Sequence, residues 1–167
     1  IKMSDFIKEI LITNTIHLNM DECSKSKNVD GLIKYKFKKE NEKLCNKHGY
    51  VIEDSTKIIN RSMGKLVNHD NKSMVEYKIS VKLDIIYPCE KDIYTCKIDN
   101  ITKMGVIGYL SNDKYNIENS PILFIIPTQY IDDTELLKKD MNIEIEVLQS
   151  RIKYKSNQIQ VVGKLSK

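Results

Sequence analysis

The clearest pattern in the chain is an alternation of apolar and polar residues from Val75 to Tyr87. A period of two residues predicts a β-strand with one face on a core and the other face mostly in water. This strand would have 13 residues, which is long enough to run past the edge of its own sheet. Pro88 ends the strand because proline lacks the N–H that a sheet needs, so residues 88–92 are the expected junction between two domains.

After this junction, residues 92–167 predict five short strands, with one helical stretch between the third and the fourth. The expected strands are Ile93–Asp99, Val106–Ser111, Ile122–Ile126, Asn142–Arg151 and Gln158–Leu165, and the helical stretch is Thr134–Lys139. This is the element order of an OB-fold barrel, a shape that often binds single-stranded nucleic acid.

Before the long strand, the pattern predicts a smaller unit that mixes helix and strand. Ile10–Met20 alternates and is expected to open the unit as a strand, whereas Val29–Lys47 has the spacing of a moderately amphipathic helix. The pair His48–Gly49 predicts the end of that helix. A second strand is expected at Tyr50–Ile59, followed by a basic, glycine-containing loop over residues 60–65.

The predicted fold class is therefore α+β, with a small α/β domain over residues 1–88 and a five-stranded OB-fold barrel over residues 89–167. The apolar share of 41% and the charged share of 30% are typical of a soluble globular protein. The sequence has no apolar run of about 18 residues, so no transmembrane helix is expected. Its first residues lack the layout of a signal peptide.

Charge permits a nucleic-acid partner without requiring one. The net charge is +4, and a solvated lysine-rich surface explains it equally well. Arg61 and Arg151 are the only arginines, and guanidinium groups bind phosphates and carboxylates better than ammonium groups do. The cysteines show neither paired metal spacing nor a disulfide framework, which predicts free thiols in a reducing, intracellular compartment. They are Cys23, Cys45, Cys89 and Cys96.

Nothing in the sequence predicts catalysis, a metal or a cofactor. The histidines at positions 17, 48 and 69 lie far from any nucleophile motif, and Cys45 with His48 has no second pair to complete a metal site. Asp132, Asp133 and Glu135 form an acidic cluster, which is more typical of a helix N-terminus than of a two-metal nuclease. Asp132 or Asp133 is expected to cap the helical stretch that follows.

Basic and aromatic residues interleave at two places in the predicted barrel. Such a mixture can hold a phosphate backbone and stack on bases, although ordinary surface chemistry on an edge hairpin is the alternative. The candidate residues are Lys97, Lys103, Tyr109, Lys114, Tyr115, Arg151, Lys153, Tyr154 and Lys155. The chain has no Trp and three Phe, so we expect weak, sequence-independent RNA contact rather than tight binding.

The order of an α/β unit, a long strand and an OB barrel covers nearly the whole chain, and several segments match one known family in order and spacing. The matching segments are Ile10–Met20, His48–Ile52, Gly64 with Tyr77–Val81, and the barrel segments Met104–Gly108, Leu123–Ile126, Ser150–Ile152 and Val162–Leu165. In these segments the chain resembles the stalk subunit of multisubunit DNA-directed RNA polymerases. This is the seventh-subunit family of eukaryotic polymerase II, which has an archaeal equivalent and counterparts in large DNA viruses.

The resemblance implies a non-catalytic subunit whose first domain, a truncated RNP-like fold, docks on the large polymerase subunits. The docking loop of the family maps onto Arg61, Ser62, Met63, Gly64 and Lys65. The resemblance also implies that the barrel lies near the RNA exit, touches nascent RNA, supports transcription initiation and pairs with a second, helical stalk subunit. The location implied is the nucleus, or the cytoplasm or virion for a viral version.

Two alternatives from other classes remain at this point. A free OB-fold RNA-binding translation factor would explain the barrel but not the first domain or the loop at residues 61–65. A small nuclease would use the acidic cluster that includes Asp133, and it would require metal-dependent RNA cleavage.

Overall fold

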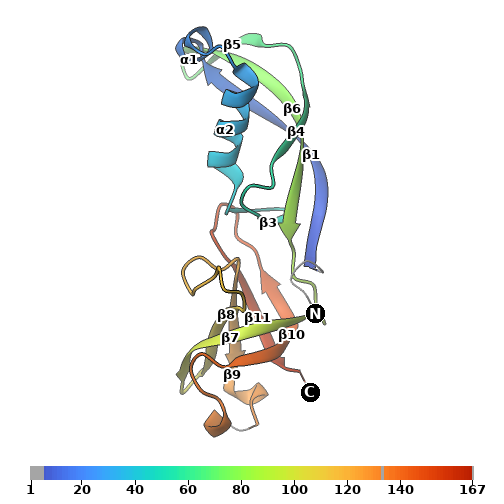
Figure 1. Ribbon diagram of the computed structural model, residues 1–167, viewed down its shortest axis with the longest axis vertical. Helices are drawn as coiled ribbons and strands as arrows, with labels where there is room; N and C mark the ends of the chain where they lie inside the picture. Colours follow the sequence, from blue (N-terminus) through green and yellow to red (C-terminus); the bar gives the residue numbers. More distant parts are fainter. Residues whose placement is uncertain (1–5, 133, 167) are drawn as a thin grey trace. The chain divides into compact units, whose positions relative to one another are not determined.

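The computed structural model of the protein describes residues 6–132 and 134–166. The fold is mixed α+β, with many strands and few helices, and its contacts divide the chain into two compact units (Figure 1). The barrel unit takes in Lys43–Tyr50 and Ile86–Lys167, together with Ile1–Ile7, as far as these residues are described. The sheet unit takes in Lys8–Glu42 and Val51–Ile85.

The barrel unit contains a closed barrel of five strands, as the sequence predicted. Neighbouring strands follow the order β10-β11-β9-β8-β7, and β10 also pairs with β7 to close the cylinder. All pairs are antiparallel except β9 with β11, which is parallel. This arrangement is consistent with an OB-fold. The strands are β7 (Ile93–Thr102), β8 (Gly105–Leu110), β9 (Ile122–Pro127), β10 (Asn142–Arg151) and β11 (Ile159–Leu165).

Alternation along these strands fills the barrel interior. Along most of the length of β7, β9, β10 and β11, every second residue is apolar and points inward, because successive side chains of a strand face opposite sides. The inward side chains are Tyr94, Cys96, Ile98, Ile122, Phe124, Ile126, Ile143, Ile145, Val147, Ile159 and Val161, all buried. Phe6 stacks on Tyr94 with ring centroids 4.0 Å apart. The core of the barrel is therefore set by the period of two that the sequence displays.

The helical stretch expected at Thr134–Lys139 is much shorter in the structure. A 3-10 turn, η3, covers Thr134–Leu136, and a second turn, η2, covers Thr128–Tyr130. The chain reaches β7 again at Asp140, whose amide donates to the carbonyl of Ile98 at 2.8 Å. Residues 137–139, the rest of the expected stretch, are not helical. The expected cap Asp133 lies outside the described residues.

The sheet unit is built around β6 (Lys72–Ile86), the long strand predicted from the alternation. Strand β1 (Ile7–Asn19) neighbours β6, and β4 (Lys57–Arg61) and β5 (Lys65–His69) both pair with it in antiparallel register. Helix α2 (Val29–Asn41) lies along one face of these strands (Figure 1). Its buried residues pack in one core with alternate residues of β1 and β6. The core comprises Ile33 and Phe37 with Ile16, Leu18, Val51, Tyr77, Ile79, Val81, Leu83 and Ile85.

Two predicted boundaries in the sheet unit were wrong. Helix α2 ends at Asn41 rather than at Lys47, and the strand predicted at Tyr50–Ile59 is interrupted after Val51. The carboxylate of Glu42 accepts hydrogen bonds from the amides of Asp54 (2.9 Å) and Thr56 (3.3 Å). These bonds hold a turn between the two parts of the predicted strand, so its second part becomes the separate strand β4.

The residues after α2 form a hairpin in the barrel unit instead of a final helical turn. Strand β2 (Cys45–Asn46) pairs with β3 (Gly49–Val51). Gly49 has φ +133°, and a Cβ there would come within 2.4 Å of the carbonyl oxygen of Ile86. The predicted helix stop is therefore a site of close backbone approach, which only glycine permits. A short helix that the sequence did not predict, α1 (Met20–Lys25), follows β1 and is capped by Asn19.

Candidate docking loop and nucleic-acid interface

The predicted docking loop connects β4 to β5. Arg61 is the last residue of β4 and Lys65 is the first residue of β5, so Ser62, Met63 and Gly64 form the connection. The amide of Ser62 donates to the carbonyl of Lys78 at 2.8 Å, and the amide of Lys78 donates to the Ser62 hydroxyl at 2.9 Å. The loop is thereby fastened to the central strand β6.

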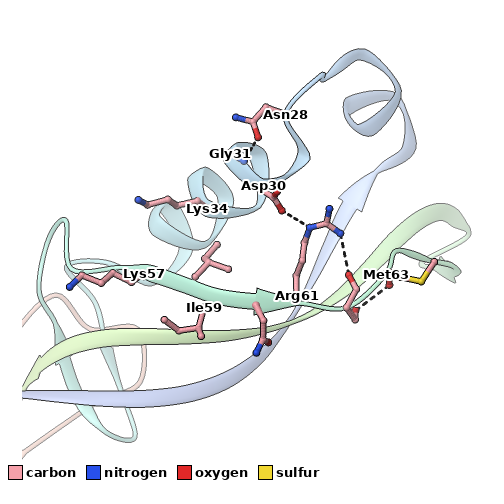
Figure 2. A pocket seen from close by; sticks show the side chains of 11 residues that line it. Asn28, Asp30, Gly31, Lys34, Lys57, Ile59, Arg61 and Met63 are labelled. Carbon is pink, nitrogen blue, oxygen red and sulfur yellow. Dashed lines mark hydrogen bonds and ion pairs between the residues drawn. The ribbon is translucent and has the colours of Figure 1, made fainter.

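The side chain of Arg61 is held in place by contacts with Asp30, Ser62 and Tyr77. Its Nε donates to a carboxylate oxygen of Asp30, and its Nη1 donates to the carbonyl of Ser62 at 3.2 Å (Figure 2). Its guanidinium also lies 5.4 Å from the ring centroid of Tyr77, a cation–π distance. Arg61 thus ties the start of the loop to α2 and β6, which fixes the direction in which the following residues leave the sheet.

Met63 is the exposed residue of this loop. Its side chain is 89% exposed, and Leu66 on β5 is 64% exposed. A Cβ at Gly64 would come within 2.7 Å of a methyl group of Val75 and 3.0 Å of the Tyr77 hydroxyl. The loop therefore lies close against β6 at Gly64 and presents Met63 to solvent. The exposed side chain of Met63 is thus carried by a loop whose backbone is hydrogen-bonded to β6.

An open groove of about 820 Å³ lies beside the loop, between the first turns of α2 and strand β4 (Figure 2). Lys34 on α2 and Lys57 on β4 add positive charge to a wall that also contains the Arg61–Asp30 pair. The wall is completed by Asn28, Gly31, Ile58, Ile59, Asn60, Ser62 and Met63. Its charge is mainly positive.

The first group of predicted RNA-binding residues is spread over the outside of the barrel. Lys97 points outward from β7, opposite Tyr109 of β8 and Asn142 of β10. Lys103 is exposed in the turn between β7 and β8, and Lys114 is exposed in the loop between β8 and β9. Tyr109 is 8% exposed, so its ring offers little surface to a base.

The second group lies at the end of β10 and in the loop between β10 and β11, and the structure separates its members. Arg151 and Lys153 line a hollow of about 220 Å³ together with Ser156, Gln158 and Gln160. Tyr154 instead lines a different hollow, and it is 71% exposed. Lys155 has φ +64°, and its ammonium lies 5.5 Å from the ring centroid of Tyr154.

The hollow at Tyr154 includes residues that sequence reasoning missed. It has a volume of about 250 Å³ and is lined by Asn46, Lys47, Tyr87, Ile152 and Tyr154. These residues come from three segments of the chain, so no sequence window brings them together. The one local signal is the glycine at position 49, which marks a turn after Asn46 and Lys47.

The described residues contain no group of three or more His, Cys, Asp or Glu placed to hold a metal ion. His17 contacts Glu76 at 3.2 Å and its ring stacks on that of His69 with centroids 5.1 Å apart. Burial raises the pKa of the Cys45 thiol to about 11 and that of the Cys96 thiol to about 12. Both thiols are protonated at neutral pH and are poor nucleophiles.

The four cysteines are free thiols, as expected. Over residues 6–132 and 134–166, no helix has the length and apolar character needed to cross a membrane. A scan against protein-family models and a search of curated proteins both found no match.

Proposed function

We propose that this chain is a non-catalytic stalk subunit of a multisubunit DNA-directed RNA polymerase. The observation that carries the proposal is the presence, in one chain, of a closed five-stranded barrel and a sheet unit organised on the 15-residue strand β6. The sheet unit would correspond to a truncated RNP-like docking domain, and the barrel to the OB domain near the RNA exit.

The fastened loop at residues 61–65 supports the docking part of this proposal. A docking element needs a fixed backbone and an exposed anchor, because ordering a mobile loop on binding costs conformational entropy. Ser62 and Gly64 fix the backbone against β6, and Met63 is exposed. In this proposal Met63 enters an apolar pocket on a large polymerase subunit, and Lys65 contacts its rim.

The basic residues of the barrel support the RNA part. Lys97, Lys103 and Lys114 occupy the outer wall and its loops, and Arg151 and Lys153 line one hollow. Such contacts are weak and independent of base sequence. Weak contacts suffice for a subunit that the polymerase holds beside its transcript, because tethering raises the local RNA concentration. A second stalk subunit is a further expected partner.

Affinity purification of the tagged full chain from native extract, followed by mass spectrometry, tests the proposal. A stalk subunit is expected to travel with the large polymerase subunits in amounts comparable to its own. Co-purification with ribosomes and without polymerase would instead support a free RNA-binding translation factor, and the polymerase proposal would be abandoned.

A further inference from the structure

The hollow at Tyr154 is held together by backbone contacts within the barrel unit. The amide of Cys45 donates to the carbonyl of Ser156 at 2.8 Å, and the amide of Lys155 donates to the carbonyl of Cys45 at 2.9 Å. The hairpin of β2 and β3 is thereby fixed to the loop between β10 and β11. Asn46 and Lys47 consequently stand beside Tyr154, although more than a hundred residues separate them in the sequence.

Tyr87 reaches the same hollow because Gly49 lets the chain pass close to the hairpin. Gly49 pairs with Asn46, and a Cβ at Gly49 would lie 3.3 Å from the Cβ of Tyr87. The amide of His48 donates to the Oδ1 of Asn46 at 2.7 Å, which holds the hairpin turn. The two tyrosines are therefore brought to one site by a built arrangement of turns and strand pairs.

The chemistry of this hollow is aromatic and positive. Tyr87 is 39% exposed and Tyr154 is 71% exposed, so both rings are accessible. Lys47 is exposed and has no ion-pair partner among the described residues, and neither Asp nor Glu is among the described residues that line the hollow. An accessible ring attracts a flat π-system, and an unpaired ammonium attracts phosphate.

We propose that this hollow is a base-binding site for single-stranded RNA. One unpaired base stacks on the tyrosine rings, and Lys47 contacts a phosphate next to it. At about 250 Å³ the hollow is smaller than the sites that take drug-sized ligands, which suits a single planar group. Arg151 and Lys153, in the neighbouring loop hollow, are placed to contact further phosphates. The proposal deepens the RNA-contact part of the proposed function and rests on it.

The test measures binding of the full chain to a fluorescent single-stranded RNA oligonucleotide by anisotropy, over a series of salt concentrations. Tyr154→Ala and Tyr87→Ala are each expected to weaken binding about tenfold, because a stacked base contributes about 1–3 kcal/mol. Tyr154→Phe keeps a ring and is expected to bind within about twofold of the original chain. Tyr35→Ala is the matched control, since Tyr35 is 66% exposed on α2 and does not line this hollow.

The salt dependence separates the two kinds of contact. A ring contributes no counterion release, so Tyr154→Ala lowers affinity without changing the slope of log K against log salt. Lys47→Ala is expected to reduce that slope by about 0.7, the value for one phosphate contact on a single strand. A change of fold would alter both quantities together, so this pattern does not arise from a structural defect.

Several results would overturn the base site. These are undetectable RNA binding by the original chain, equal binding of a duplex and a single strand, and unchanged affinity in both alanine variants. Binding of a proline-rich peptide through the same tyrosines, without RNA binding, would assign the hollow to a protein partner. Single-stranded DNA of the same sequence tests whether the site distinguishes RNA.

The base-binding site and the polymerase proposal can fail independently of each other. Ring-dependent RNA binding by a chain that does not co-purify with polymerase would support the base site and reject the stalk function. Co-purification with polymerase together with ring-independent RNA binding would support the stalk function and reject the base site.

Discussion

Gly108 on β8 lies against the sulfur of Cys96 on β7, so closely that a Cβ at Gly108 would be 2.3 Å from that sulfur. The same Cβ would be 2.6 Å from the carbonyl oxygen of Lys97, which is backbone and has little freedom to move. Gly108→Ala is therefore expected to lower the free energy of unfolding by about 1–3 kcal/mol, the usual cost of overpacking a core. Urea denaturation followed by circular dichroism measures this change.

Gly31→Ala in α2 is the matched control for that substitution. The side chain of Asn28 caps α2 by accepting a hydrogen bond from the Gly31 amide at 3.0 Å. A Cβ at Gly31 would meet the end of that side chain at 2.8 Å, and the side chain can rotate away only by giving up the cap. Loss of the Asn28 cap and the gain in helix propensity are of similar size, about 1 kcal/mol each, and oppose one another. If Gly31→Ala lowered the free energy of unfolding as much as Gly108→Ala, close packing at Gly108 would not be the cause of the destabilisation.

The buried thiols make stability depend on alkaline pH. Burial raises the pKa of Cys45 to about 11 and that of Cys96 to about 12, from an ordinary value of 9.0. The folded state thus retains protons that the unfolded chain loses, so this stabilisation is complete below pH 9 and declines as pH rises towards 11 and 12. Each thiol accounts for at most about 1.4 kcal/mol per pH unit within that window.

Urea denaturation at pH 7.5, 9 and 10 measures this decline in the free energy of unfolding. Cys96→Ala is expected to reduce the decline, because it removes the thiol whose pKa is raised furthest. A free energy of unfolding that stays constant up to pH 10 would show that the thiols are not protonated preferentially in the folded state.

Met63 gives the sharpest test of the docking loop. If the proposed stalk function is correct, Met63→Ala is expected to reduce incorporation into polymerase about fivefold or more, since an anchor at an interface contributes more than about 1 kcal/mol. The isolated chain should keep its stability, because Met63 is 89% exposed. Quantitative mass spectrometry of purified polymerase measures incorporation.

Met104→Ala is the control, since Met104 is 86% exposed in the turn between β7 and β8 of the barrel. It should be incorporated as the original chain is. Equal incorporation of both variants would place the docking surface away from Met63.

The turn between β5 and β6 offers a test of backbone strain. Asp70 and Asn71 form a two-residue connection in which both have positive φ, +50° and +62°. Asn71→Ala is expected to cost about 1–2 kcal/mol, because alanine disfavours the left-handed region, whereas Asn71→Gly is expected to be neutral or stabilising. Thermal unfolding of the two variants measures the difference, and equal melting temperatures would contradict it.

The strands of the barrel could be predicted because their interior positions alternate along each segment. Strand β10 has the predicted bounds, and the others differ by one to three residues at an end. The end of α2 could not be predicted. The amide of Cys45, which the predicted helix included, instead donates a hydrogen bond to the carbonyl of Ser156, far along the sequence. A local pattern carries no information about such a partner.

The candidate surfaces were predictable only in part. The sequence indicated Arg61 and Met63 as one loop, but it did not indicate that Asp30 holds the guanidinium of Arg61. Tyr109 was a candidate for stacking because of its neighbours in the sequence, yet it is 8% exposed. Tyr87 and Lys47 were missed because two strand pairings and one loop bring them to Tyr154.

Strand β11 inserts between β9 and β10. During synthesis, the barrel therefore stays open until residues 159–165 emerge from the ribosome. Until then β9 and β10 each expose an unpaired edge beside apolar inner faces, which is the condition under which chains associate wrongly. Pairing β10 with β7 and β11 with β9 also joins distant parts of the sequence, which slows folding. The final strand thus sets the moment at which the nascent barrel is protected from aggregation.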